Sequence, residues 1–343
     1  MPARPSPLPP DALLLAPMVG LSHRPLRELV LGFGGCDLAY TEMTSAAGYL
    51  SGAPYDRYFL DTGPEPGRAV LQFYAVDAPR MVQAARKAAR EIPAAGLDLN
   101  FGCSAPHIEK AGGGVSWMKD PGAARDLVAR VRDARPEGGI SAKLRVGYDE
   151  DYGRLRDFCG GLAEAGADWL VLHPRLRSEK LRRTCRWDYV RRLGEDLDIP
   201  VVGNGDIRGP EDHAARVREC RPAGIMLGRE AVRRPWVFAL IRGLERDPGF
   251  QITVDIAGTA ETALRLMEEH QPPEFHISRA RRFFYYYCDN LSFAHHIRWK
   301  IQNAPDLKAI RQALAEYFEE VPGDRSQVTG ARPQEPGDRG TSR

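Results

Sequence analysis

Cys103 is the residue best placed to do chemistry. It stands in LDLNFGCSAPHIEKAGGG, directly after a short apolar run. A thiol with a reference pKa of about 8.5 is mostly protonated at neutral pH, which suits a general acid that gives one proton to carbon when a polarised double bond is reduced. The glycines at 112–114 suggest a mobile loop that closes over a substrate, with a plain linker as the alternative.

Most lone cysteines are small buried hydrophobes. We expect this of the five that do not follow a strand in a polar glycine loop, namely Cys36, Cys159, Cys185, Cys220 and Cys288.

Polar side chains recur where the apolar runs of the chain end. The run ends are Ala16-Pro17-Met18, Glu42, Gln72, Asn100, Lys143 with Arg145, His173, Asn204-Gly205-Asp206, and Gly228-Arg229. A single buried Asn or His is usually structural. Because uncompensated burial of a polar group costs on the order of 1–3 kcal/mol, packing alone does not explain a whole ring of them, and the ring predicts a binding site.

Two matched loops, VVGNGDIRG and IMLGRE, indicate a phosphate site. Gly205 and Gly228 let backbone amides approach a phosphate closely, and the forked guanidinium of Arg229 can bind its oxygens. A turn glycine and a surface cation are the alternative.

A planar cofactor with a phosphate, such as a flavin, would fit the remaining residues. Lys143 would place positive charge beside the pyrimidine end of the ring, where negative charge appears on reduction. Gln72 would hydrogen-bond the ring edge, and Ala16-Pro17-Met18 would form a flat wall. Lys143 could instead form a buried ion pair with Glu42 or Asp98.

Eight short apolar runs, separated by stretches of helical periodicity, must position these residues. They are residues 13–18, 38–42, 69–74, 97–101, 140–146, 169–173, 200–204 and 224–228. This alternation predicts a parallel sheet, and eight units predict a (β/α)8 TIM barrel with its site at the C-terminal strand ends. An open doubly wound sheet is less favoured, because LLAPMVG replaces the GxGxxG fingerprint after the first strand.

The pattern changes after about residue 243. We expect an N-terminal extension at 1–12, the α/β barrel at 13–245, and a smaller all-helical domain at 254–320. Residues 321–343 are polar and rich in Gly and Pro, which predicts a disordered tail.

The composition excludes several classes of protein. No two of the six cysteines form a CxxC pair, so no metal site is expected. No segment approaches the roughly 20 apolar residues that span a bilayer, and the N-terminus lacks a signal-peptide core. A cytoplasmic protein without a membrane segment is predicted. The net charge is only +2, so any nucleic-acid surface must be local.

Together the motifs resemble the tRNA-dihydrouridine synthases. The resemblance runs from about residue 13 to about residue 236, through LLAPMVGLSHRPLR, TEM, LQFYA, LDLNFGC, SAKLRVGYD, LHPR, IPVVGNGDI and IMLGR. It implies an oxidoreductase in which NADPH reduces FMN, hydride passes from the flavin to C6 of uracil in tRNA, and Cys103 protonates C5. The segment around Cys103 is most similar to the DusC subgroup, which acts in the D-loop.

The resemblance also assigns binding residues. Those for FMN are Ala16, Pro17, Met18, Gln72, Lys143, His173, Asn204, Gly205, Asp206, Gly228 and Arg229. Asn100 matches a uracil contact, and Arg145 and Arg175 match positions near the substrate backbone. NADPH would dock over the flavin, since no separate nucleotide-binding domain is visible. Three loop residues depart from the family pattern: His23, Ser104 and Leu176.

Two basic clusters predict a track for tRNA. Seven Lys or Arg residues and two Asp residues lie between positions 279 and 311, and HPRLRSEKLRRTCRW follows the sixth strand. Such side chains bind phosphates without choosing a sequence. Arg298 and Lys300 are the predicted contacts, whereas the FFYYY run at 283–287 is expected to be helix core. A solvated basic face is the alternative.

Two other functions remain open. A small-molecule FMN oxidoreductase of the dihydroorotate dehydrogenase type would explain the flavin residues but not the basic helical region. An RNA-binding protein that keeps the fold without catalysis would not bind FMN.

Overall fold

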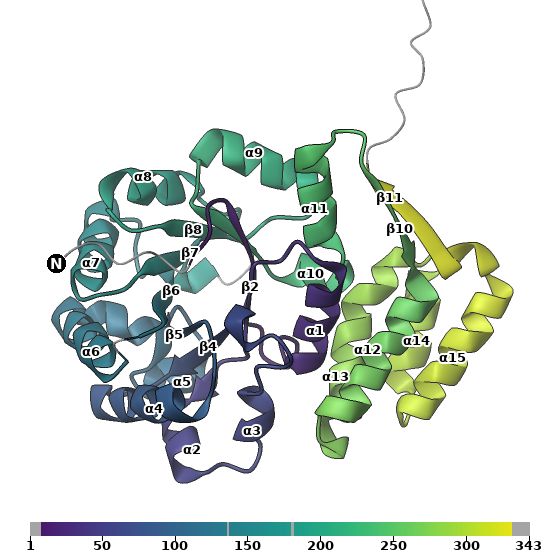
Figure 1. Ribbon diagram of the computed structural model, residues 1–343, viewed down its shortest axis with the longest axis horizontal. Helices are drawn as coiled ribbons and strands as arrows, with labels where there is room; N and C mark the ends of the chain where they lie inside the picture. Colours follow the sequence, from purple (N-terminus) through teal and green to yellow (C-terminus); the bar gives the residue numbers. More distant parts are fainter. Residues whose placement is uncertain (1–7, 136, 180–181, 331–343) are drawn as a thin grey trace, which may run out of the picture.

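The computed structural model describes residues 8–135, 137–179 and 182–330, and shows a parallel barrel beside a group of helices (Figure 1). The barrel strands are β1 (Ala12–Leu15), β2 (Leu38–Tyr40), β4 (Ala69–Tyr74), β5 (Gly96–Phe101), β6 (Gly139–Gly147), β7 (Trp169–Leu176), β8 (Val201–Asn204) and β9 (Gly224–Leu227). β1 pairs with β9, and β2 pairs with both β1 and β4, which closes the ring. The short β3 (Thr44–Ser45) extends the sheet beside β4. The predicted TIM barrel is confirmed.

Each barrel strand is buried on both faces. Leu14, Val70 and Val171 belong to the cluster inside the barrel, whereas Leu13 and Leu71 pack in the layer between the strands and the helices. Burial on both faces explains why the strands are continuous apolar runs in the sequence rather than alternating ones.

Helices follow the strands around the barrel. They are α1 (Arg24–Phe33), α2 (Ala46–Ser51), α3 (Asp56–Phe59), α4 (Ala78–Glu91), α5 (Pro106–Lys110), α6 (Pro121–Ala134), α7 (Tyr152–Glu164), α8 (Asp188–Asp196), α9 (Pro210–Cys220), α10 (Arg229–Arg233) and α11 (Val237–Arg246). The side chains of Asp77, Asp120 and Asp151 accept hydrogen bonds from first-turn amides of α4, α6 and α7. These caps fix where each connecting loop ends and its helix begins.

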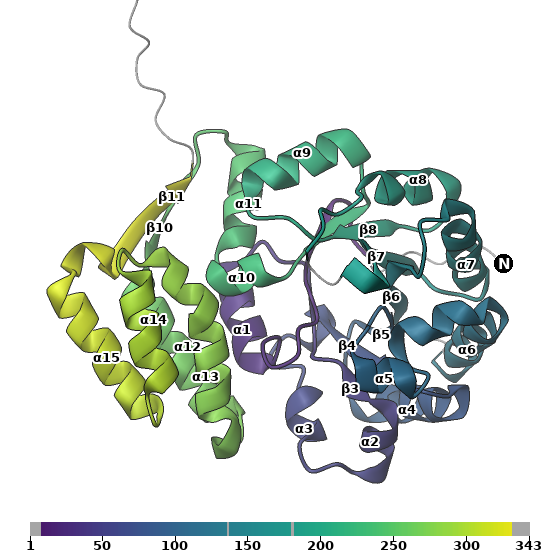
Figure 2. The ribbon, with the colours of Figure 1, turned by 180° about the vertical axis from the view of Figure 1, so that it is seen from behind.

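Four further helices form a second unit, which the reverse view shows beside the barrel (Figure 2). They are α12 (Ile256–His270), α13 (Pro273–Tyr287), α14 (Ala294–Asn303) and α15 (Leu307–Glu320). α12 packs on α1, and α13 packs on α10. In the part of the chain that the structure describes, no helix is long and apolar enough to cross a membrane.

The aromatic run at 283–287 is helix core only in part. Phe283, Phe284 and Tyr287 are buried, as predicted. Tyr285 is exposed, and Tyr286 lines the cavity described below. Residues at i and i+3 or i+4 share one face of a helix, so five consecutive residues cannot all face the same core.

The predicted disordered tail at 321–343 is wrong for its first part. Residues 326–330 form β11 (Ser326–Gly330), which pairs antiparallel with β10 (Gln251–Asp255). The second unit is therefore not wholly helical. The polar segment SQVTG has no hydrophobic pattern that would predict a strand. Its strand hydrogen bonds come from β10, which lies far from it in the sequence. Residues 331–343 lie outside the described residues.

The N-terminal boundary also shifts. β1 begins at Ala12, and Leu8 is buried in the cluster inside the barrel. The end of the predicted 1–12 extension is thus part of the barrel, while residues 1–7 lie outside the described residues.

Candidate active site

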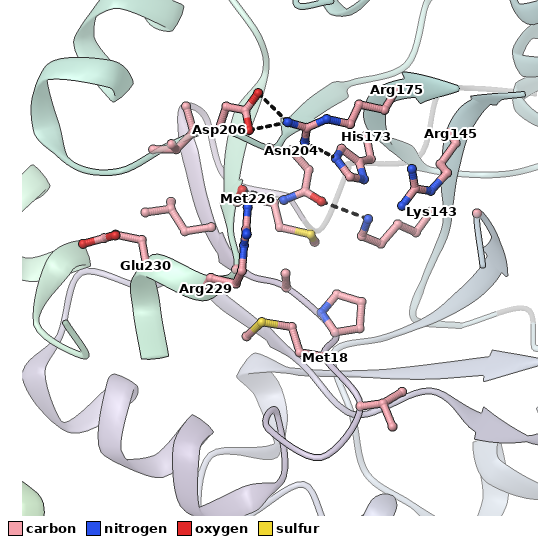
Figure 3. Close-up of a pocket in the computed structure, with 18 of the residues that line it drawn as sticks. Met18, Lys143, Arg145, His173, Arg175, Asn204, Asp206, Met226, Arg229 and Glu230 are labelled. Atoms are coloured by element: carbon pink, nitrogen blue, oxygen red, sulfur yellow. Dashed lines mark hydrogen bonds and ion pairs between the residues drawn. The ribbon is translucent and has the colours of Figure 1, made fainter. Parts of the chain in front are cut away.

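A cavity of about 700 Å³ opens at the C-terminal ends of the barrel strands. Figure 3 shows Lys143, His173 and Asn204 converging on it from neighbouring strands. Of the predicted residues, it is lined by Ala16, Pro17, Met18, Gln72, Asn100, Cys103, Lys143, Arg145, His173, Arg175, Asn204, Gly205, Asp206, Gly228 and Arg229. Its size falls in the range of small-molecule and cofactor sites.

The lining includes residues that the sequence did not single out. They are Val19, Met43, Gly102, Leu144, Ile207, Arg208, Met226, Leu227, Glu230, Arg233 and Tyr286. Most of them neighbour a predicted residue at a strand end, so the strand-end rule could have found them. Tyr286 reaches the cavity from α13, and no local sequence pattern marks it.

Arg175 is tied to the loop after β8. Its guanidinium binds Asp206 through both carboxylate oxygens, at 2.6 and 2.8 Å, and its Nη1 lies 2.9 Å from His173 Nε2 (Figure 3). Because arginine only donates, Nε2 accepts and Nδ1 carries the ring proton. Burial, followed by the positive charges of Lys143 and Arg145, lowers the pKa of His173 to about 2. His173 is therefore a neutral hydrogen-bonding group at any physiological pH.

Lys143 directs its charge into the cavity. Its Nζ donates to Asn204 Oδ1 at 3.0 Å, and Asn204 Nδ2 donates to the carbonyl of Met226 at 2.8 Å. Among the described residues Lys143 has no ion pair with either suggested partner, and Glu42 pairs with Arg279 instead. Burial, and then Arg145, lowers the pKa of Lys143.

A chain of hydrogen bonds connects the barrel interior to the Cys103 loop. Gln72 Nε2 donates to Asp98 at 2.7 Å, and Asn100 Nδ2 donates to Gln72 Oε1 at 3.0 Å. Asn100 Oδ1 accepts from the backbone N–H groups of Gly102 and Cys103 at 3.1 and 2.8 Å. These bonds fix which atom of the Gln72 and Asn100 side-chain amides is the oxygen and which is the nitrogen. The backbone N–H groups at one end of the chain can only donate, and the Asp98 carboxylate at the other end only accepts. Asn100 thus holds the Cys103 loop in place.

The glycine run at 112–114 supports Cys103 instead of forming an open loop. Gly114 has φ of +57°, and a Cβ there would collide with the carbonyl oxygen of Cys103. That oxygen accepts from Val115 N–H at 2.9 Å. The sequence suggests a mobile closing loop, but close backbone packing explains this glycine.

We predict that the Cys103 thiol stays protonated throughout the neutral range. Burial raises its pKa and outweighs the opposing charge of Arg145. The alkylation rate of the Cys103 peptide, measured by mass spectrometry with iodoacetamide across a pH series, should therefore reach its midpoint at a higher pH than that of a free thiol. A midpoint below that of a free thiol would contradict the role of general acid.

The two glycine loops that were predicted to bind a phosphate both line the cavity. Gly205 has φ of +122°, and a side chain there would strike Cys185 Sγ and the His173 ring. Arg229 forms no ion pair with any described residue, whereas the adjacent Glu230 pairs with Arg233 and Arg234. The guanidinium of Arg229 is therefore available to bind an anion.

Arg298 and Lys300 do not line the cavity. The Arg298 guanidinium pairs with Asp289 and lies 5.4 Å from the centre of the Tyr285 ring. Lys300 Nζ lies 3.6 Å from Glu316 Oε2. Nearby carboxylates therefore compensate both predicted RNA contacts.

In the second basic cluster, which follows β7, some of the arginines have a carboxylate partner and others have none among the described residues. Arg177 pairs with Glu109, and Arg186 pairs with Glu179 and Glu150. Arg182 and Arg183 are exposed and form no ion pair within the described ranges. The carbonyl of Arg183 accepts from Arg175 Nε, which places this loop at the rim of the cavity.

The fold and the site define a (β/α)8-barrel protein with a cavity at its C-terminal mouth that several cationic side chains line. Among solved structures, histamine dehydrogenase from Rhizobium sp. 4-9 has a similar fold, with a TM-score of 0.55 and 16% identity over 77% of this chain and 50% of that chain. The chain belongs to the dihydrouridine synthase family, whose model matches residues 14–322. The resemblance inferred from the motifs is confirmed.

Two relatives illustrate the similarity. The tRNA-dihydrouridine(16) synthase of Cupriavidus necator is 35% identical over 245 residues, which are 68% of this chain and 74% of that protein. The protein of the same name from Neisseria meningitidis serogroup B is 27% identical over 324 residues, covering 90% and 95%.

Proposed function

We propose that this protein is a tRNA-dihydrouridine synthase that reduces the C5=C6 bond of a uridine in tRNA, with FMN as cofactor and NADPH as reductant. The observation that carries the proposal is one cavity lined by Cys103, by the half-buried Lys143 and by Arg229, which forms no ion pair with any described residue. The names of both relatives specify position 16, so we propose that D-loop uridine as the target.

The residues present fit FMN. Arg229 and the amides around Gly205 and Gly228 would hold its phosphate, Lys143 would oppose charge on the pyrimidine end, and Ala16-Pro17-Met18 would cover one face. When bound, the flavin supplies the hydride that C6 of the uracil receives.

The protein supplies the proton. Cys103 Sγ gives its proton to C5 of the uracil and regains one from solvent afterwards. Asn100 positions the Cys103 backbone. Because His173 is neutral, it would offer a hydrogen bond to the cofactor without adding another positive charge to the cavity. The uridine must leave its stack to enter the cavity.

The loop after β7 supplies cations for the tRNA backbone, and we predict that it contributes more to binding than α14. Arg182→Ala with Arg183→Ala should raise the KM for tRNA and lower the salt dependence of binding, since each lost phosphate contact changes the logarithmic slope by about 0.7–0.9. Filter binding across a salt series measures this. Arg298→Ala with Lys300→Ala is the matched pair of substitutions on α14, and a larger effect of that pair would contradict the assignment.

The function is tested by reconstituting the purified protein with FMN, supplying NADPH and unmodified tRNA, and mapping dihydrouridine. RNA from cells with and without the gene shows whether position 16 is the target. A protein that reduces a small pyrimidine but no tRNA would indicate the dihydroorotate dehydrogenase type. A colourless protein that cannot take up FMN would indicate a non-catalytic RNA-binding protein.

A further inference from the structure

A buried ion pair joins the barrel to α13. Glu42, two residues after the end of β2, and Arg279 on α13 are 3% and 5% exposed, and Arg279 Nη1 lies 2.8 Å from Glu42 Oε2. The rings of Phe59 and Phe275 have their centres 5.7 and 5.1 Å from the guanidinium carbon. A buried charge is tolerated only when it is paired, so each partner fixes the position of the other.

His23 lies close to Arg279 but cannot balance its charge, so Glu42 is the counter-ion of Arg279. The buried ring of His23 has a pKa well below its ordinary value because of burial, and then because of the charge of Arg279. A neutral His23 offers no negative charge. Within the described ranges no other carboxylate forms an ion pair with Arg279.

The Val19–Gly20 peptide unit connects the ion pair to the cavity. The second carboxylate oxygen of Glu42 accepts the N–H of Gly20, and Arg282 Nη1, also on α13, donates to the carbonyl of Val19 at 3.1 Å. The N–H and the C=O belong to the same peptide bond, so α13 holds it at both edges, directly and through Glu42. Gly20 has φ of +76°, and a Cβ there would crowd Arg282.

This peptide unit belongs to the loop that lines the cavity. Met18 and Val19 both face the cavity. The Met18 carbonyl accepts from the N–H groups of Leu21 and Ser22 at 3.0 and 2.9 Å, and Ser22 Oγ accepts from Met18 N–H at 2.8 Å. Because the turn is closed by its own hydrogen bonds, fixing the Val19–Gly20 peptide also fixes Met18.

We propose that Glu42, Arg279 and Arg282 are positioning residues of the cofactor wall, so that α13 is a structural part of the flavin site. None of the three lines the cavity. They act by holding the 17–22 loop against the barrel. The identity of the ligand on that wall rests on the proposed function.

The first measurement needs no cofactor. Amide hydrogen exchange of peptides covering residues 17–23 should increase at least tenfold in Arg279→Met and several-fold in Arg282→Ala. Arg282 is exposed, so that variant keeps the test valid if Arg279→Met folds poorly. Arg279→Lys retains a charge for Glu42 and should recover most of the protection. The matched control is Arg311→Ala, which removes ion pairs with Glu261 and Glu268 elsewhere on the helical unit.

The second measurement is FMN affinity by fluorescence titration. Arg279→Met and Arg282→Ala should bind FMN at least tenfold and about threefold more weakly, whereas Arg311→Ala should bind it normally. Unchanged exchange at 17–23 in folded Arg279→Met and Arg282→Ala would overturn the proposal. If the unaltered protein binds no FMN, the proposed function fails, and exchange alone decides the positioning role.

Discussion

Cys103→Ala is expected to lose dihydrouridine formation while it still binds FMN and still oxidises NADPH. A positioned general acid contributes roughly 10²- to 10⁴-fold to a rate, so kcat for tRNA reduction should fall by about that factor. FMN binding should be preserved, because Asn100 and Val115 hold the loop through the backbone of Cys103, not its thiol. Stopped-flow absorbance separates reduction of the flavin by NADPH from its reoxidation by tRNA.

The control for this variant is Cys220→Ala, which removes a buried thiol at the end of α9 that does not line the cavity. It should keep full activity. Cys103→Ser retains a hydroxyl in place and should recover little, since a serine hydroxyl is a much weaker acid than a thiol. Full product formation by Cys103→Ala would remove Cys103 from the mechanism, and loss of FMN binding would indicate a structural role instead.

The barrel was predictable because its strands are buried on both faces and end at the same mouth. That geometry brings Gln72, Lys143, His173 and Arg229 into one cavity although they are far apart in the sequence. The strand-end residues could therefore be assigned to a common site before any distance was known, since only the parallel order of the strands was needed.

Sequence patterns failed where a residue depends on a partner from another element. Lys300 belongs to a basic stretch by composition, but Glu316 on α15 compensates it. The sequence offers Glu42 as a partner of Lys143, but α13 places Arg279 beside it. Tyr286 reaches the cavity for the same reason. The packing of α13 on the barrel decides which face of the helix is turned toward the cavity, and no local sequence pattern encodes that packing.

Arg229→Ala is expected to weaken FMN binding by about ten- to a hundredfold and to leave riboflavin binding unchanged. A hydrogen bond to a charged group contributes about 1.5–3 kcal/mol, and each 1.4 kcal/mol is about tenfold in affinity. Within the described part of the chain Arg229 has no ion pair to break, and Glu230 keeps its own partners. The loss should therefore report the phosphate contact alone.

Riboflavin makes this test sharp, because it has the ring and the ribityl chain of FMN but no phosphate. In the unaltered protein FMN should bind far more tightly than riboflavin, and Arg229→Ala should remove most of that difference. Arg234→Ala, which removes a cation outside the cavity that pairs with Glu230, controls for a general change in charge. An equal loss of FMN and riboflavin affinity would show that Arg229 contacts the flavin ring or stabilises the fold. The phosphate would then have to bind elsewhere in the cavity.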